Sequence, residues 1–305
     1  MNISEKICRL KQETDTVILA HYYVDGDVQK IADFVGDSYA LAKMAAETTQ
    51  QNILFAGVSF MGESAKLLNP AKHVYMADET AGCPMADMVT TVQVQEIRKK
   101  YPEAAVVCYV NSSAEVKAES DVCVTSSNAV RVVKKMNQKQ IYFIPDSHLA
   151  HFVAKQIPEK EFIFHNGYCP THRSIERKYL LEAKAKYPNA PVLAHPECAE
   201  DVLALADYIG STMEIIRYAK NDAAKEYIIA TETGVFHQLK KENPEKKFYP
   251  VIPSQVCPDM KKVTLEKIAY VLENMGTGCC PEVLLDKQVI ERAKRPLEQM
   301  LKLAL

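Results

Sequence analysis

The chain has 305 residues, of which 48% are hydrophobic, and it carries a formal net charge of -2 at pH 7. This composition is ordinary for a globular protein of two or three compact units. Nucleic acid is excluded as the main partner, because phosphate binding draws on clustered Lys and Arg and no basic run is present. No stretch approaches the roughly 20 apolar residues of a membrane span, and the charged N-terminus does not resemble a signal peptide. We therefore expect a cytoplasmic protein, without a membrane or nucleic-acid partner, that binds small molecules.

The predicted elements follow the same order three times along the chain. Each round opens with an amphipathic helix, continues with short apolar strands that alternate with helices, and ends in a loop with a Cys-Pro dipeptide. The opening helices are expected at residues 4–13, 92–100 and 175–186, and the first strands begin at Val17, Val106 and Pro191. Buried strands alternating with helices are typical of a parallel sheet covered on both faces.

We therefore predict an α/β fold of three homologous three-layer α/β/α domains with short parallel sheets. The domains are expected at residues 1–90, 91–174 and 175–262, followed by a C-terminal helical segment at 263–305. Open α/β sheets bind ligands at the carboxyl ends of their strands. An arrangement around a pseudo-threefold axis, with these edges inward, would create one central active site.

When the three repeats are aligned, polar residues fall at three sets of matching positions, which we call columns. The columns support a threefold internal repeat, because their spacing is kept from one repeat to the next. Alignment on Asp33, Asp121 and Asp207 uses offsets of 88 and 86 residues. The columns contain His21, Tyr109 and His195; Tyr23, Asn111 and Glu197; and Ser38, Ser126 and Thr212. Since each column falls at a strand end or a helix start, we expect these side chains to meet at the central site.

Cys83, Cys169 and Cys257 each precede a proline and are separated by 86 and 88 residues. Cysteines in a reducing compartment are poor candidates for disulfides, and thiolates are soft ligands for iron-sulfur clusters, zinc or copper(I). Three thiolates on a four-iron cluster would leave one iron open to substrate as a Lewis acid. A structural zinc site, with His172 as its fourth ligand, is an alternative. Cys280 also precedes a proline but has no counterpart, so we expect a surface or packing role.

Ser38, Ser126 and Thr212 are expected at the N-cap positions of helices that follow the second strand of each repeat. Helix capping alone explains such hydroxyls. Several helix N-termini aimed at one cavity also form sites for phosphate or carboxylate groups, which favours an anionic substrate. The His, Tyr, Asn and Glu side chains of the other two columns add acids, bases and amide donors at the same edge.

Six segments resemble, in this order and over nearly the whole chain, the quinolinate synthase family: HYYVDGDVQKIADFVGDS, CPMADM, YVNSSAEVKAESDVCVTSSNAV, NGYCPTH, HPEC and GST. That family has three homologous α/β/α domains and a 4Fe-4S cluster held by one cysteine from each. It condenses iminoaspartate with dihydroxyacetone phosphate to quinolinate, inorganic phosphate and water in de novo NAD biosynthesis. The resemblance implies the same fold, cofactor and substrates, and a functional link to an enzyme that produces iminoaspartate.

The resemblance also implies roles for individual residues. The cluster ligands it implies are Cys83, Cys169 and Cys257. The substrate-binding residues are expected to be His21, Ser38, Met61, Asn111, Ser126, His172, Ser211 and Thr212. The catalytic residues are expected to be Tyr23, Tyr109, His195 and Glu197. Tyr23 and Glu197 are expected to transfer protons in isomerisation and dehydration steps that move no net electrons.

Two other interpretations fit parts of the pattern. A radical enzyme of diphthamide synthesis is similar in placing one cysteine on each of three related domains, and it cleaves S-adenosylmethionine. The polar columns suit a small polyanionic substrate better than the protein side chain on which that enzyme acts. A non-enzymatic protein that binds a metal or an anion is the third interpretation, and it predicts that Tyr23→Phe and Glu197→Gln leave function intact.

Overall fold

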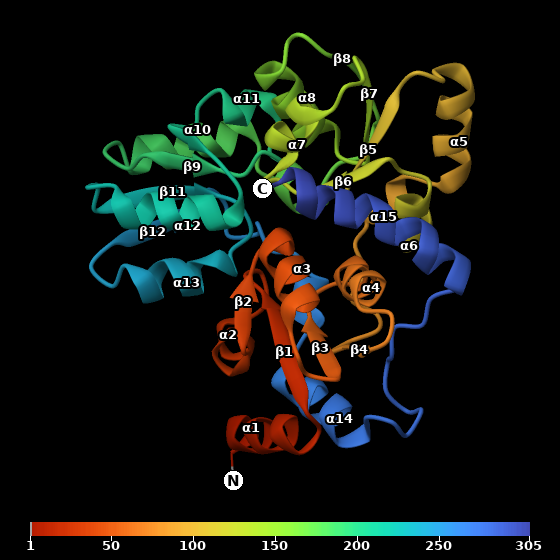
Figure 1. Ribbon diagram of the computed structural model, residues 1–305. Helices are drawn as coiled ribbons and strands as arrows, with labels where there is room; N and C mark the ends of the chain where they lie inside the picture. Colours follow the sequence, from red (N-terminus) through yellow and green to blue (C-terminus); the bar gives the residue numbers. More distant parts are fainter. Residues whose placement is uncertain (1) are drawn as a thin grey trace.

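The computed structural model describes residues 2–305 and contains three sheets of four strands each, with helices packed on their faces (Figure 1). The strand pairs are parallel, and each sheet has the spatial order second, first, third and fourth strand. These observations confirm the predicted α/β fold of three α/β/α units. Within residues 2–305, no helix has both the length and the apolar character required to cross a bilayer.

The first unit begins with a helix and has the sheet order β2-β1-β3-β4. Its strands are β1 (Thr16–His21), β2 (Phe34–Gly36), β3 (Asn52–Ala56) and β4 (His73–Met76). Its helices are α1 (Ile3–Glu13), α2 (Gly26–Ile31), α3 (Ser38–Glu47), α4 (Ser59–Leu68) and the short 3-10 helix η1 (Ala86–Met88). Strand β1 is buried along its whole length, as expected for a strand covered on both faces.

The second unit repeats this pattern in the sheet order β6-β5-β7-β8. Its strands are β5 (Ala105–Tyr109), β6 (Val122–Val124), β7 (Gln140–Ile144) and β8 (Glu161–Phe164). Its helices are α5 (Thr91–Lys100), α6 (Ala114–Ala118), α7 (Ala129–Lys135), α8 (Ser147–Gln156) and the short α9 (Pro170–Arg173).

The third unit has the sheet order β10-β9-β11-β12. Its strands are β9 (Val192–Ala194), β10 (Tyr208–Ile209), β11 (Glu226–Ala230) and β12 (Lys247–Pro250). Its helices are α10 (Arg177–Lys186), α11 (Glu200–Leu203), α12 (Thr212–Asn221), α13 (Val235–Glu242) and the 3-10 helix η2 (Met260–Lys262). The three sheets fall within the predicted domain ranges, whose limits at 90, 174 and 262 stay a prediction.

The C-terminal segment forms two helices, α14 (Leu265–Asn274) and α15 (Lys287–Leu303). Helix α14 packs against α1, and α15 packs against both α4 and α6 (Figure 1). One face of α15 is buried through Ala293, Leu297 and Met300. Because α15 contacts the first and second units together, the segment joins these two units into one continuous hydrophobic core.

The same aspartate clamp orders the first two strands of every unit. In each unit one carboxylate oxygen accepts the backbone N–H of a residue in or beside the first strand, at 2.7 to 2.9 Å. The pairs are Asp33 with Ile18, Asp121 with Val106, and Asp207 with Val192. The clamp satisfies a buried donor that a second strand of only two or three residues leaves without a ladder partner.

The strand order also determines where a ligand can bind. In each sheet the second strand lies on one side of the first strand and the third strand lies on the other, so the topological switch point falls between the first and third strands. His21 ends β1, Tyr109 ends β5, and His195 directly follows β9. The three switch points therefore carry the first predicted column of polar residues.

Candidate functional site

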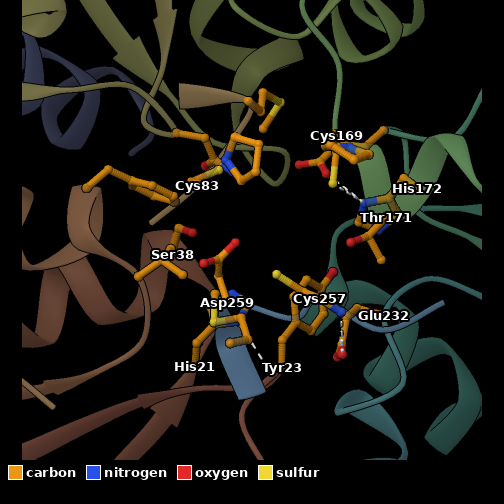
Figure 2. Close-up of a pocket in the computed structure, with 18 of the residues that line it drawn as sticks. His21, Tyr23, Ser38, Cys83, Cys169, Thr171, His172, Glu232, Cys257 and Asp259 are labelled. Carbon is orange, nitrogen blue, oxygen red and sulfur yellow. Dashed lines mark hydrogen bonds and ion pairs between the residues drawn. The ribbon is translucent and has the colours of Figure 1, made fainter. Parts of the chain in front are cut away.

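The carboxyl edges of the three sheets surround one cavity of about 120 Å³. Side chains from all three units point toward this common space in Figure 2. The predicted site residues that line it are His21, Tyr23, Ser38, Cys83, Tyr109, Asn111, Ser126, Cys169, His172, His195, Glu197, Thr212 and Cys257. Residues separated by more than 230 positions in the sequence are therefore brought to one place.

Two predicted residues lie behind the cavity wall instead. Met61 is in helix α4, is only 4% exposed and packs in the hydrophobic core, whereas its neighbour Phe60 lines the cavity. Ser211 is fully buried at the N-cap of α12, where its hydroxyl accepts the N–H of Glu214 at 3.4 Å. The Glu214 carboxylate accepts the Ser211 N–H in return, which completes a capping box.

The predicted N-cap positions of Ser38, Ser126 and Thr212 are wrong by one or two residues. The N-caps of α3, α7 and α12 are Asp37, Asn128 and Ser211. Ser38 and Thr212 are instead the first helical residues, and Ser126 lies in the turn before α7. Aspartate, asparagine and serine are all good N-caps, so residue type alone could not distinguish the actual N-cap from the predicted residue close to it. Capping therefore does not account for the three hydroxyls that face the cavity.

Each Cys-Pro dipeptide begins a helical turn at the cavity. The cysteine carbonyl oxygens accept backbone N–H groups three or four residues later: Ala86 to Cys83 at 2.8 Å, Arg173 to Cys169 at 2.9 Å, and Lys261 to Cys257 at 3.3 Å. Proline is well suited to the first position of such a turn, because its φ is already helical and it has no N–H to satisfy. The preceding cysteine is thereby held at a defined point on the cavity wall.

The three thiols are partly buried, and burial makes them less acidic than an exposed cysteine. Burial raises the pKa of Cys83 to about 12, and burial also raises the pKa values of Cys169 and Cys257. Such thiols stay protonated at neutral pH unless a metal displaces the proton. Without a bound metal, these cysteines are therefore poor nucleophiles.

The spacing of the sulfurs argues against one shared zinc ion. A sulfur of Cys169, a nitrogen of His172 and an oxygen of Glu197 lie within 4.8 Å of one another, and neither Cys83 nor Cys257 belongs to this group. In a tetrahedral zinc site with Zn–S bonds of about 2.3 Å, ligand sulfurs would lie only about 3.8 Å apart. Since the sulfurs of Cys83, Cys169 and Cys257 do not all lie within 4.8 Å of one another, the three thiols could not ligate one tetrahedral zinc ion without moving closer.

A continuous chain of hydrogen bonds links two tyrosines across the cavity. The Tyr23 hydroxyl contacts Thr231 Oγ1 at 2.8 Å, and Thr231 Oγ1 contacts His172 Nε2 at 2.9 Å. His172 Nδ1 lies 2.8 Å from Glu197 Oε2, and the Tyr109 hydroxyl donates to Glu197 Oε1 at 2.5 Å. All five side chains are largely buried, and hydrogen-bonded chains of this kind can pass protons between their ends.

The electrostatics divide these groups into acids and a base. Burial, together with the nearby Glu197 carboxylate, raises the pKa values of Tyr23 and Tyr109 well above their ordinary value. Burial also opposes ionisation of Glu197, but the adjacent His172 and the hydrogen bonds from His172 and Tyr109 lower the pKa of its carboxyl. Near neutral pH the tyrosines are therefore proton donors, and Glu197 is an ionised acceptor.

Two histidines in the cavity remain neutral because they are buried. Burial lowers the pKa of His21 and of His195 to about 3. His195 Nε2 lies 3.2 Å from the Ser126 hydroxyl, which belongs to the second unit. A neutral imidazole can donate or accept a hydrogen bond, so both rings can orient a polar ligand without adding charge.

One polar atom of the site has no partner within the protein. Asn111 Oδ1 is buried and makes no hydrogen bond among the described residues. An unpaired buried acceptor is costly and is usually satisfied by a ligand or by water. Asn111 thus offers one acceptor to a donor group of a bound molecule.

Sequence reasoning missed several residues of the site. Thr171, Glu232 and Asp259 line the cavity, and Thr231 completes the hydrogen-bonded chain. Glu232 was detectable, because Val58, Asp146 and Glu232 follow the same offsets of 88 and 86 as the three predicted columns. Thr171 and Asp259 each lie two residues after a ligand-type cysteine, so the Cys-Pro turns were a signal for them.

Comparison with known proteins gives matches over nearly the entire chain. Residues 5–302 match the family described as "Quinolinate synthetase A protein". A quinolinate synthase from Fusobacterium nucleatum is 48% identical over 302 residues, covering 99% of both chains. Those from Clostridium kluyveri (50% over 296 residues, 97% of this chain and 96% of the relative) and Aquifex aeolicus (47% over 309 residues, 99% and 94%) are similarly close.

Proposed function

The chain belongs to the quinolinate synthase family of enzymes, and we propose that it condenses iminoaspartate with dihydroxyacetone phosphate to give quinolinate, phosphate and water in NAD biosynthesis. The atoms balance without a net transfer of electrons, so the reaction requires proton transfers, loss of phosphate and loss of water. The cavity supplies what these steps need: protonated tyrosines, an ionised glutamate and neutral polar groups.

The observation that carries the proposal is the convergence of Cys83, Cys169 and Cys257, one from each unit, on the cavity that also contains the polar columns. We propose that these three cysteines hold a 4Fe-4S cluster. When bound, a cluster with three protein ligands supplies one iron that can act as a Lewis acid toward the nitrogen and carboxylate of the substrate. The origin of the three cysteines in three different units supports this assignment, as does the observation that their sulfurs do not all lie within 4.8 Å of one another.

The hydroxyl residues are proposed to bind the anionic groups of the substrates. Ser38 and Thr212 begin helices α3 and α12, where the helix dipole and the hydroxyl groups favour a phosphate or a carboxylate. His21 and Ser126 would hold phosphate or carboxylate groups. Asn111 would contact the dicarboxylate intermediate, since its Oδ1 lacks a protein partner.

The hydrogen-bonded chain from Tyr23 to Tyr109 is proposed to move the protons. Glu197 is the ionised member and accepts a proton, while each tyrosine hydroxyl donates one at its end of the chain. His172 and Thr231 join the two ends, so that a proton released at one end can be replaced by a proton taken up at the other. His195, a neutral neighbour of His172, would orient the substrate.

Cellular context follows from the same chemistry. None of the nine cysteines is paired in a disulfide, and cluster ligands of this kind require a reducing compartment, so we propose that the enzyme works in the cytoplasm. Iminoaspartate is an imine that water hydrolyses. A separate enzyme that produces it is therefore proposed to act in functional association with this one.

Anaerobic purification followed by iron and sulfide analysis tests the proposal. We expect about four irons and four sulfides per chain, as a 4Fe-4S cluster requires, together with turnover of iminoaspartate and dihydroxyacetone phosphate. A colourless protein with stoichiometric zinc would overturn the cluster assignment. Cleavage of S-adenosylmethionine without quinolinate formation would instead favour a radical enzyme of the diphthamide type, which family membership does not support.

A further inference from the structure

A buried carboxylate lies directly behind the turn that carries Cys257. Glu232 has no exposed surface, and its Oε1 accepts the backbone N–H of Cys257 at 3.1 Å. Its Oε2 accepts the N–H of Gly234 at 2.5 Å. A charge without exposure is tolerated only when its oxygens are paired, so these contacts fix the carboxylate and the cysteine backbone relative to each other.

One cation extends this contact to Tyr23. The Lys261 Nζ lies 3.3 Å from Glu232 Oε1 and donates to the backbone oxygen of Tyr23 at 2.7 Å. Lys261 belongs to η2, which follows Cys257, whereas Tyr23 follows β1 in the first unit. The ion pair therefore connects the third cysteine turn with the loop that carries an expected proton donor.

The turn that contains Glu232 is also packed tightly against Tyr23. A Cβ atom on Gly234 would lie 2.6 Å from backbone atoms of Tyr23, so only glycine permits this approach. The side-chain amide of Gln29 donates to the Gly234 oxygen at 3.1 Å, and the Thr231 hydroxyl contacts the Tyr23 hydroxyl at 2.8 Å. Tyr23 is thus held at its backbone and at its phenol by residues 231–234 and 261.

Comparison of the three units shows that the fold does not itself require an acid here. Val58 occupies the equivalent position of the first unit, and Asp146 occupies that of the second. Asp146 is fully buried, accepts the N–H of Leu149 at 2.8 Å and lies near the Cys169 N–H, but its Oδ2 has no hydrogen-bond partner in the described chain. Asp146 is the N-cap of α8, which explains its presence, whereas α13 has Gly234 as its N-cap and the Glu232 oxygens accept the N–H groups of Gly234 and Cys257. Side-chain capping therefore does not account for the buried acid at position 232.

We propose that Glu232 and Lys261 are a pair of positioning residues that hold the Cys257 turn and Tyr23 in one fixed relative position. The inference rests on the function proposed above, in which Cys257 is a cluster ligand and Tyr23 donates a proton. Glu232 orients the cysteine through its backbone N–H, and Lys261 transmits this geometry to the tyrosine loop.

The test compares anaerobically purified Glu232→Ala, Glu232→Gln and Lys261→Met with the wild type. The readouts are iron and sulfide content, the rate at which a ferrous chelator removes iron, and kcat and KM. Matched controls from the same unit are Glu226→Ala, at the far end of β11, and Lys220→Met, in a surface ion pair. Circular dichroism establishes that each variant is folded.

We expect Glu232→Ala to lose iron about tenfold faster than the wild type, as is typical when a residue supporting a metal ligand is removed. Glu232→Gln should lose iron at a rate within about twofold of the wild-type rate, because its amide oxygen can still accept the Cys257 N–H. Lys261→Met should keep its iron but lower kcat by about tenfold at nearly unchanged KM, which indicates misplacement of a group used in the transition state. The double variant Glu232→Gln with Lys261→Met leaves no uncompensated buried charge and should show the same loss of kcat.

The proposal is overturned if Glu232→Ala releases iron at the rate of Glu226→Ala, or if Glu232→Gln releases it as fast as Glu232→Ala. An unchanged kcat in both Lys261 variants overturns the part that concerns Tyr23. A wild type that binds no iron-sulfur cluster overturns the function proposed above, and this pair with it. If the wild type binds the cluster and the variants behave like the wild type, only the positioning role of Glu232 and Lys261 is overturned, and the function proposed above stands.

Discussion

The Tyr109 hydroxyl donates a 2.5 Å hydrogen bond to Glu197 Oε1, and this bond joins the second and third units at the centre of the molecule. Tyr109 ends β5, and Glu197 lies three residues beyond the end of β9. The other carboxylate oxygen of Glu197 contacts His172, which lies in the second cysteine turn. The acid and the base of the proposed reaction are therefore assembled only when two units dock.

Tyr109→Phe removes the donor of this bond and leaves the aromatic ring in place. We expect kcat to fall by about 100-fold or more, in the range typical of a lost general acid, while the iron content stays at the wild-type value. Steady-state kinetics and iron analysis on the same preparation check this result. Glu197→Gln should show a similar loss, and the double variant should lose little more than either single variant, because both belong to one chain. Wild-type turnover in both single variants would refute the proton-transfer roles proposed for Tyr109 and Glu197.

The cysteine ligands can be tested against a cysteine of similar local sequence. Cys83→Ala, Cys169→Ala and Cys257→Ala should each purify without a stable cluster, because two thiolates do not retain four irons. Cys280→Ala should retain it, since Cys280 lies after helix α14 and its thiol donates to the Asn274 carbonyl at 3.2 Å. Visible absorption and iron analysis under anaerobic conditions report the result. Loss of iron in Cys280→Ala together with retention in any of the first three would refute the ligand assignment.

The parts of the fold that repeat could be predicted from the sequence. The fixed offsets between Asp33, Asp121 and Asp207 reflect one backbone geometry built three times, and each aspartate makes the same hydrogen bond. Helix starts were less accurate, because Asp37 and Ser38 are both capable caps and only the backbone angles decide between them.

The parts of the site that depend on docking between units could not be predicted. Thr231 directly follows β11, and nothing in its local sequence shows that its hydroxyl lies between Tyr23 and His172. Met61 was expected at the cavity wall, but helix phase turns Phe60 toward the cavity and Met61 into the core. Contacts between distant segments depend on how the units pack, and local sequence periodicity carries no information about this.

The aspartate clamp allows a stability prediction that is separate from the active site. Asp207→Ala leaves the N–H of Val192, a residue with no exposed surface, without its 2.7 Å partner. We expect a loss of about 1–3 kcal/mol in the free energy of unfolding, the usual cost of an unpaired buried donor. Asp207→Asn keeps an acceptor oxygen and should lose less. Urea unfolding under anaerobic conditions measures both, and equal unfolding midpoints for Asp207→Ala and the wild type would contradict the clamp.

The buried histidines predict a dependence of stability on pH with a definite sign. Burial lowers the pKa of His21 and His195 to about 3 in the folded protein, whereas an unfolded histidine has a pKa of about 6.5. Between these values the unfolded chain binds protons that the folded chain does not, so stability falls as the pH decreases below about 6.5 and is insensitive to these groups above it. Each histidine should therefore make the free energy of unfolding about 2 kcal/mol smaller at pH 5 than at pH 7.5.

A variant isolates one of these contributions from the other titrating groups. His195→Asn replaces a titrating ring by a neutral amide, so it should lose about 2 kcal/mol less than the wild type between pH 7.5 and pH 5. Urea unfolding of the iron-free protein at both pH values gives the difference, without any contribution from acid release of the cluster. If wild type and variant lost the same stability over this range, His195 would be protonated in the folded state, and the cavity would then contain a cationic imidazole beside Glu197 instead of the neutral ring that its burial predicts.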